Sequence, residues 1–270
     1  MYTEFFGFDA KPFGKTPDPA YLYLSPEHRE ALARLEYAVE EKDLALLVGE
    51  IGSGKTTLSR ALIDRVGDSR PIILIINPRL SPTQLLRSVA SGLGMKPRYF
   101  RNDLLDQIHE RLYELYEEGR EPILMIDEAQ LIPQKATFDE IRLLTNFQLD
   151  AENMLTVILI GQPELEKRLA HSSYKALSQR IGLRYSLGPL GSDQTVRYFQ
   201  YRIKVAGGRR NPFTKEAMKA ASRFARGVPR LINTLATTAL LDAFGDDVHE
   251  IDELRIESAA KEHRLFREED

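Results

Sequence analysis

Short apolar runs alternate with longer stretches in which apolar residues recur every three or four positions. The runs are nearly free of polar residues, which is typical of strands buried on both faces of a parallel sheet. They cover residues 44–48, 71–76, 122–126 and 155–160, and residues 183–187, which include Arg184 and Ser186, are a candidate fifth strand. The intervening stretches have the spacing of amphipathic helices, which we expect at 26–41, from 57, at 81–94, 102–119 and 137–148. The pattern predicts a parallel sheet with helices on both faces.

The strand pattern ends near Gly188-Pro-Leu-Gly191, and only helical periodicity follows. Helices are expected at 193–205, 214–224 and 229–244, and from Asp252. The sequence therefore predicts three parts: an N-terminal segment over 1–42, an α/β core over 43–190 and an all-helical domain over 191–270.

The N-terminal segment combines aromatic residues with turn-forming prolines. Tyr21 and Tyr23 follow the turn signal Thr16-Pro-Asp-Pro19, and four phenylalanines precede it: Phe5, Phe6, Phe8 and Phe13. Such a strap either fills the core or encloses part of a ligand, for example an adenine ring. Ser25 followed by Pro26 is a helix start, with Ser25 as the N-cap.

Composition and charge exclude several classes of protein. The 270 residues are 43% apolar, with a formal net charge of −3 and no cysteine. Disulfides, thiolate catalysis and cysteine-based zinc sites are thereby excluded, and a polyanion site would have to be a local patch. No apolar run has the length of a transmembrane helix, and the N-terminus does not resemble a signal peptide, so a cytoplasmic location is expected.

One motif between the first strand and the next helix predicts nucleotide binding. Residues 49–56 match GxxxxGK[ST], the pattern of a phosphate-binding loop. Its glycines let backbone N–H groups converge on phosphate oxygens at the positive end of a helix. Lys55 would reach the β- and γ-phosphates, and the Thr56 hydroxyl would bind Mg²⁺. The residues expected to hold ATP are Gly49, Glu50, Ile51, Gly52, Ser53, Gly54, Lys55, Thr56 and Thr57.

Polar residues terminate the third and fourth strands. Asp127 and Glu128 follow the run Leu124-Met-Ile126. Asp127 is the candidate to hold Mg²⁺ with Thr56, and Glu128 to polarise the water that attacks the γ-phosphate. Gln162 follows the fourth strand and is a candidate γ-phosphate sensor if that strand lies between the first and third; alternatively, it only starts the turn before Pro163.

Several further segments resemble the AAA+ ATPases, and in particular the ExeA-like branch that includes general secretion pathway protein A. They are the Phe-Phe-Gly-Phe opening, Lys11-Pro-Phe13, Tyr23-Leu-Ser25, Asp127-Glu-Ala-Gln130, residues 140–146, Gly161-Gln-Pro-Glu-Leu165, residues 177–181 and Gly227-Val-Pro-Arg230. The resemblance covers nearly the whole chain. It implies a five-stranded P-loop sheet in the order 5-1-4-3-2, with the C-terminal helical domain as a lid.

The resemblance also assigns arginines and implies an oligomer, either a ring or a filament. Arg180 occupies the place of the arginine finger that reaches the nucleotide of a neighbouring subunit, and Arg184 is a rival for this role. Arg230 matches the lid arginine called sensor 2. Surface or helix-start ion pairs are the alternative roles for these arginines.

The sequence leaves two biological roles open for an ATPase of this kind. The first is an assembly or regulatory factor of the ExeA-like secretion type. Because the chain ends at Asp270 without the membrane span of the secretion members, a separate membrane partner is expected. The second, from a more distant resemblance to the TniB and TnsC regulators of transposition, is ATP-dependent binding of duplex DNA and recruitment of a transposase. The candidate DNA contacts are Arg79, Thr83, Lys96, Arg98 and Arg101, unless this is simply a solvated basic loop.

Overall fold

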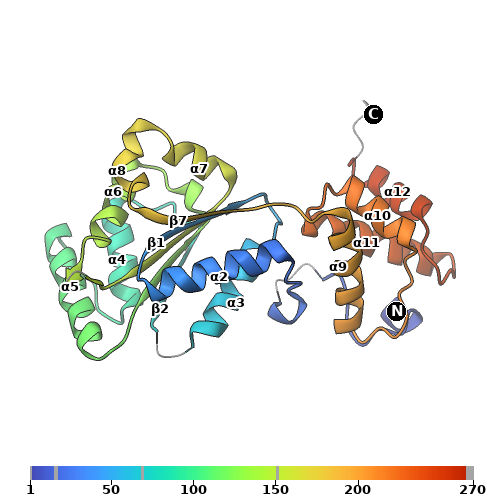
Figure 1. Cartoon of the computed structure of the whole chain (residues 1–270), viewed down its shortest axis with the longest axis horizontal. Helices are drawn as coiled ribbons and strands as arrows, with labels where there is room; N and C mark the ends of the chain where they lie inside the picture. Colours follow the sequence, from blue (N-terminus) through green and yellow to red (C-terminus); the bar gives the residue numbers. More distant parts are fainter. Residues whose placement is uncertain (1, 15–17, 68–69, 150–151, 266–270) are drawn as a thin grey trace. The chain divides into compact units, whose positions relative to one another are not determined.

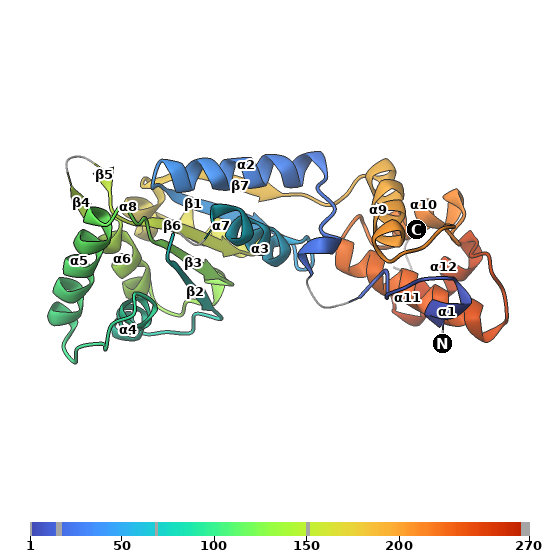
Figure 2. The same ribbon diagram turned by 90° about the horizontal axis from the view of Figure 1, so that it is seen from below.

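The fold is described from a computed structural model, which describes residues 2–14, 18–67, 70–149 and 152–265. The chain divides into two compact units, each of which is described by itself. Unit 1 combines Met1–His28, Glu50–Leu58 and Gly188–Asp270, and unit 2 combines Arg29–Gly49 and Ser59–Leu187. Figures 1 and 2 label most of the elements of both. Thr16 and Pro17 of the expected turn lie outside the described residues.

Unit 2 is built on a five-stranded sheet whose paired strands all run parallel. Its strands are β1 (Leu44–Gly49), β2 (Ile72–Ile76), β3 (Ile123–Asp127), β6 (Thr156–Gly161) and β7 (Ile181–Leu187). The order β2-β3-β6-β1-β7 is the expected 5-1-4-3-2 in reverse, which confirms the predicted fold class. The prediction lacked one detail, a separate antiparallel hairpin of β4 (Gln148–Leu149) and β5 (Glu152–Asn153).

Helices lie on both sides of this sheet (Figures 1 and 2), with α2 and α3 on one side and α4, α5 and α6 on the other. The helices of this part are α2 (Pro26–Glu40), α3 (Lys55–Val66), α4 (Pro82–Gly92), α5 (Arg101–Glu117), α6 (Lys135–Leu144), α7 (Pro163–Leu169) and α8 (Lys175–Ser178), with the short 3-10 helices η2 (Ala129–Leu131) and η3 (Ser172–Tyr174). Ser81 caps α4 in a capping box with Gln84.

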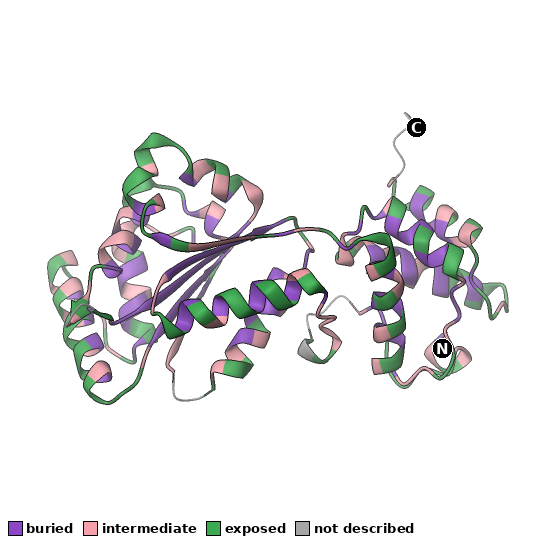
Figure 3. Ribbon diagram, in the orientation of Figure 1, coloured by how far each residue is buried: buried purple, intermediate pink, exposed green. Residues whose placement is uncertain are grey.

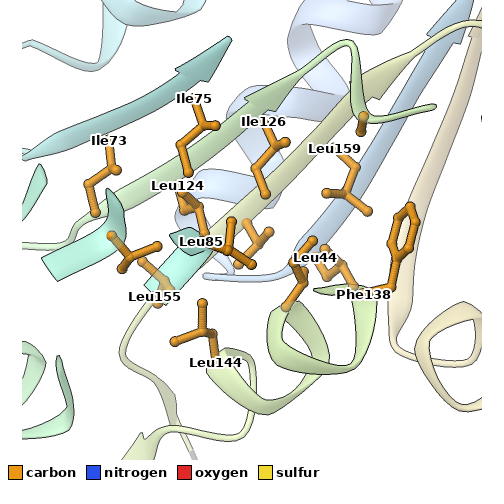
Figure 4. Packing of buried hydrophobic residues seen from close by; sticks show 14 of the residues in the cluster. Leu44, Ile73, Ile75, Leu85, Leu124, Ile126, Phe138, Leu144, Leu155 and Leu159 are labelled. Carbon is orange, nitrogen blue, oxygen red and sulfur yellow. The ribbon is translucent and has the colours of Figure 1, made fainter. Parts of the chain in front are cut away.

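The core of unit 2 follows from the alternation of side chains along each strand. Alternate residues such as Leu124 and Ile126 of β3 face the cluster formed with α4 to α8, and the residues between them face the opposite side. Figure 4 shows strand residues packed against Leu85 of α4 and Phe138 of α6. All residues of β1, β3 and β6 are buried, as the continuous buried strands in Figure 3 show, which explains why their sequences are almost wholly apolar.

The edge strand β2 departs from the prediction that both faces are covered. Ile73 and Ile75 are buried, whereas Leu74 is 44% exposed and Ile76 is 65% exposed. The uniform apolar run does not distinguish these two faces. Helix α6 is also shorter than expected, since it ends at Leu144 instead of Gln148, and Gln148 pairs with Asn153 in the hairpin. Helix α7 follows Gln162 directly and was not predicted.

Unit 1 has a helical core in which the N-terminal aromatic residues take part. Its elements are α1 (Tyr2–Phe5), η1 (Pro19–Tyr21), α9 (Ser192–Val205), α10 (Lys215–Phe224), α11 (Pro229–Gly245) and α12 (Glu253–Glu262). The Phe13 ring packs on Phe199 and Phe213, with ring centroids 5.0 and 5.8 Å away. Phe8 is buried in the same cluster. The N-terminal strap therefore fills the core of this unit, which was one of its two predicted roles.

Among the described residues, no helix is both long enough and apolar enough to cross a membrane.

Candidate functional site

The loop between β1 and α3 has the backbone geometry that its glycines predict. Gly52 has φ +83° and Gly54 has φ +103°, a region that residues with a side chain rarely adopt. The Ser53 N–H donates to the Glu50 carbonyl at 3.1 Å and closes a tight turn. Helix α3 begins at Lys55, so that Lys55, Thr56 and Thr57 form its first turn. The positive end of the helix dipole at that turn favours an anion.

Two close approaches also require glycine in this loop. A Cβ on Gly52 would lie 2.4 Å from Cβ of Arg230, and a Cβ on Gly54 would lie 2.9 Å from Nε2 of His28. The Arg230 N–H donates to the Gly52 carbonyl at 3.3 Å. Arg230 is the second residue of α11, at the helix start that the sequence predicted. Within unit 1, the loop is therefore packed between the start of α11 and the start of α2.

The polar side chains of the loop fit a phosphate group. The Lys55 ammonium is almost buried and donates to the Glu50 carbonyl at 2.9 Å, which holds it against the loop. The Ser53 hydroxyl is buried and has no hydrogen-bond partner among the described residues. Buried polar atoms are normally satisfied, so such an atom in a glycine-rich loop is consistent with a ligand that supplies acceptors.

His28 is a contact of the loop that the motif did not reveal. The side chain is 4% exposed, and its Nε2 lies 3.1 Å from the Ser53 carbonyl oxygen. Its Nδ1 lies 2.8 Å from the hydroxyl of Ser25, the cap of α2. Burial lowers the pKa of His28, while the Ser53 carbonyl and the charge of Glu27 oppose that shift. The sequence feature that could have pointed to this contact is a histidine three residues after Ser25, the first residue of the Ser-Pro helix start.

The lowered pKa of His28 predicts a loss of stability in acid. Below pH 6.5 the unfolded chain binds a proton that the folded chain resists. The free energy of unfolding should therefore fall as the pH drops below 6.5, by at most about 1.4 kcal/mol per pH unit from this group. Urea unfolding of the wild type and His28→Gln between pH 7.5 and 5.5 measures the difference. Parallel curves for the two proteins would contradict the prediction.

The acidic pair lies at the carboxyl end of β3, beside β6. Asp127 is the last residue of β3 and is 5% exposed, and its Oδ1 accepts the N–H of Glu128 at 2.8 Å. Glu128 has φ +55°, an uncommon conformation for a residue with a side chain. Since β6 separates β1 from β3, the carboxyl ends of these three parallel strands meet at one edge of the sheet. This is the strand arrangement on which the sensor role of Gln162 depends.

Two glutamines hold the Glu128 side chain. Gln162 Nε2 donates to Glu128 Oε2 at 3.2 Å, and Gln130 Nε2 donates to the same oxygen. Gln130 Oε1 also accepts the Gln162 N–H at 3.1 Å. Gln162 is the N-cap residue of α7, but its side chain makes no cap hydrogen bond and is engaged with Glu128 instead. Gln130 was not among the predicted site residues, although it lies within the Asp-Glu-Ala-Gln segment.

The two rival finger arginines lie at either side of the start of β7. Arg180 is exposed, and its guanidinium donates to the Thr145 carbonyl at 3.1 Å. Arg184 is partly buried and donates to the carbonyl and hydroxyl of Ser178, at 2.7 and 2.8 Å. Two side-chain hydrogen bonds hold the Arg184 guanidinium within its own chain, and one holds the Arg180 guanidinium.

The basic segment between β2 and α5 is only partly available to a polyanion. Arg79 and Lys96 are exposed and Thr83 is half-buried. Arg98 lies 3.8 Å from Glu110, whereas Arg101 makes two hydrogen bonds of 2.7 and 2.9 Å to the buried carboxylate of Glu140. Removing Arg101 from that pair would leave a charge buried without a partner. Arg101 therefore has a structural role in this chain, the ion pair with Glu140, beside its predicted role in DNA binding.

The donor set at the predicted metal residues suits Mg²⁺. A threonine hydroxyl and an aspartate carboxylate are hard oxygen donors. No group of three or more His, Cys, Asp or Glu side chains among the described residues could hold a metal alone. Mg²⁺ usually binds one or two protein oxygens together with substrate phosphates and water. As donor types, the Thr56 hydroxyl and the Asp127 carboxylate each suit this kind of Mg²⁺ binding.

Comparison of the sequence with known proteins gives one family and one long match. A family described as an AAA domain matches residues 39–169. General secretion pathway protein A from Aeromonas hydrophila is 38% identical over 275 residues, which cover 100% of this chain and 50% of that protein. The chain therefore spans half the length of this relative.

Solved structures with a similar fold include two proteins of Aeropyrum pernix. The ORC2 protein, in ADPNP–ADP complexes, gives a TM-score of 0.69 at 18% identity over 94% of this chain and 71% of that chain. The ORC1 protein, in complex with DNA, gives 0.66 at 18% identity over 90% of this chain and 68% of that chain. These identities show the fold alone. Together the matches show a P-loop fold of the AAA+ type and similarity along the whole length of this chain to general secretion pathway protein A.

Proposed function

We propose that this protein is a Mg²⁺-dependent ATPase that hydrolyses ATP to ADP and phosphate. The observation that carries the proposal is the phosphate-binding loop. The backbone of Gly52 and Gly54, the buried residue Lys55 and the Ser53 hydroxyl, which has no hydrogen-bond partner in the part of the chain that the structure describes, all suit a phosphate group. The AAA domain match over residues 39–169 supports a nucleotide as the source of that phosphate.

Each candidate residue has a proposed role in this reaction. Lys55 binds the β- and γ-phosphates, and Thr56 and Asp127 supply oxygens to Mg²⁺, which neutralises charge on the phosphates when bound. The Glu128 carboxylate accepts a proton from the attacking water. Gln162 orients that water, since its amide already reaches the Glu128 carboxylate at 3.2 Å. Arg230 would stabilise charge on the γ-phosphate, and Arg180 would do so on the ATP of a neighbouring subunit.

Assembly is the second part of the proposal. An arginine acting on a neighbour requires a homo-oligomer, either a ring or a filament, that forms on bound ATP and dissociates after hydrolysis. Similarity to general secretion pathway protein A favours an assembly or regulatory role of the secretion type, with a protein partner. Because the chain spans half of that relative, the activity and partners of the whole relative are part of the proposal. Duplex DNA binding stays an alternative predicted from the sequence.

Phosphate release from ATP by the purified wild-type protein tests the chemistry. We expect turnover with Mg²⁺ that falls at least about tenfold with excess EDTA, because the metal would stabilise several kcal/mol of developing charge. Binding of a fluorescent ATP analogue, followed in parallel, separates affinity from turnover. Absence of nucleotide binding at millimolar concentration would refute the proposal.

A further inference from the structure

A chain of hydrogen bonds in unit 1 joins the phosphate loop to helix α9. His28 Nε2 lies 3.1 Å from the Ser53 carbonyl, and its Nδ1 lies 2.8 Å from the Ser25 hydroxyl. Ser25 donates to a Glu27 carboxylate oxygen at 2.7 Å. Both oxygens of that carboxylate accept from Gln194 Nε2 at 2.9 Å. Gln194 lies in the first turn of α9, where its Oε1 accepts the Gly191 N–H at 2.8 Å.

These contacts exceed what a helix cap requires. Ser25 caps α2 by accepting the backbone N–H of His28 at 3.2 Å, and this bond needs no imidazole. The ring instead uses both of its nitrogens, and one of them faces the loop. Ser25 is 0% exposed and His28 is 4% exposed, so water does not satisfy either group. The ring also occupies the space beside Gly54 that a Cβ would fill.

The proton inventory fixes the direction of the bond to the loop. A carbonyl oxygen can only accept, so Nε2 of His28 carries the proton that Ser53 accepts. In a neutral ring, Nδ1 then has no proton, and the single hydroxyl proton of Ser25 is shared between Nδ1 and Glu27. Ser25, which also bonds to Glu27, therefore orients the His28 ring, and the ring places its Nε2–H toward the Ser53 carbonyl.

We propose that His28 is a positioning residue that holds the phosphate loop in its nucleotide-binding conformation. Ser25, Glu27 and Gln194 link His28 by hydrogen bonds to α9 of the lid. The proposal rests on the proposed nucleotide binding. His28 does not touch the phosphates; it fixes the carbonyl of Ser53 and thereby the curl of the backbone on which the N–H donors lie. Such preorganisation strengthens binding because less order has to be imposed on the loop.

Two polar substitutions separate the two ring nitrogens. In His28→Gln, the amide nitrogen lies near the position of Nε2 and keeps a donor for the Ser53 carbonyl. In His28→Asn, the amide lies near the position of Nδ1, so the contact with Ser25 can persist while the loop loses its donor. We expect affinity for a fluorescent ATP analogue with Mg²⁺ to stay within about threefold of wild type in His28→Gln and to weaken about tenfold in His28→Asn, the range of one hydrogen bond.

Two further variants make this test specific. Tyr198→Phe removes a part-buried hydrogen bond of unit 1, from Tyr198 to Asn233 at 2.7 Å, and should lower thermal stability without changing affinity. Gln194→Ala removes the link to α9 and should weaken binding about twofold to fivefold.

The outcomes distinguish the inference from the function on which it rests. Equal affinity of wild type and folded His28→Asn would overturn the role of His28, as would equal weakening in His28→Gln and His28→Asn. Unchanged affinity in Gln194→Ala would overturn the connection to α9. A wild-type protein that binds no nucleotide would instead refute the proposed function.

Discussion

Glu128→Gln should bind ATP with nearly wild-type affinity and lose about 10²- to 10⁴-fold in turnover, the usual contribution of a general base. The substitution keeps the shape of the side chain and an oxygen that can accept from Gln130 or Gln162. A neutral amide cannot take a proton from water, so only the chemical step should suffer. The measurement is phosphate release under single-turnover conditions, beside equilibrium binding of the ATP analogue.

Glu164→Gln is the matched control for this experiment. Glu164 is exposed in the first turn of α7, two residues after Gln162, and its substitution removes the same charge from the same region. We expect turnover within about twofold of wild type, since surface substitutions rarely matter by more than a few tenths of a kcal/mol. Wild-type turnover in Glu128→Gln would assign the base to another residue.

Lys55→Ala should weaken binding of ATP by about 10- to 100-fold, the range for a hydrogen bond to a charged group. Lys55 is 6% exposed, so water screens its charge only weakly. Isothermal titration with ATP and Mg²⁺ measures the affinity. Lys135→Ala, which breaks only the exposed ion pair with Asp139, is the control and should bind as wild type does.

Mixing Lys55→Ala with Arg180→Ala tests whether the finger acts on a neighbour. Each variant alone should be almost inactive. In a mixed oligomer, an intact loop of one subunit can meet an intact Arg180 of the next, so part of the ATPase activity should return. Absence of any recovery across mixing ratios, with oligomers present, would exclude Arg180 as the finger; the same mixture with Arg184→Ala then tests its rival.

The order of the sheet and the phosphate loop were accessible from the sequence for physical reasons. Strands β1, β3 and β6 are buried on both faces, so their apolar runs stand out, and the resemblance to AAA+ proteins supplied their order. The glycine-rich loop was accessible because few other residues adopt the backbone of Gly52 and Gly54. The end of α6 was not accessible, because the hairpin at Gln148 depends on pairing with Asn153.

The neighbours of the candidate site were harder to predict than its motifs. Gln162 reaches Glu128 across 34 positions of chain because β3 and β6 are adjacent, and the local sequence around Gln162 does not indicate this adjacency. His28 meets Ser53 across 25 positions of chain. Such contacts depend on tertiary structure, so a local pattern identifies the residue type but not its partner. The roles of all these residues in catalysis stay predictions.

Unit 1 is assembled from three stretches of chain, and this limits how the protein can be divided. Phe13 covers Phe199 and Phe213 from a distant part of the sequence. A C-terminal fragment starting at residue 191 would therefore expose aromatic surface that the first residues normally cover, and it would favour aggregation. The same connectivity delays folding, because the helices after residue 190 complete their core only when they meet the distant segment that contains Phe13.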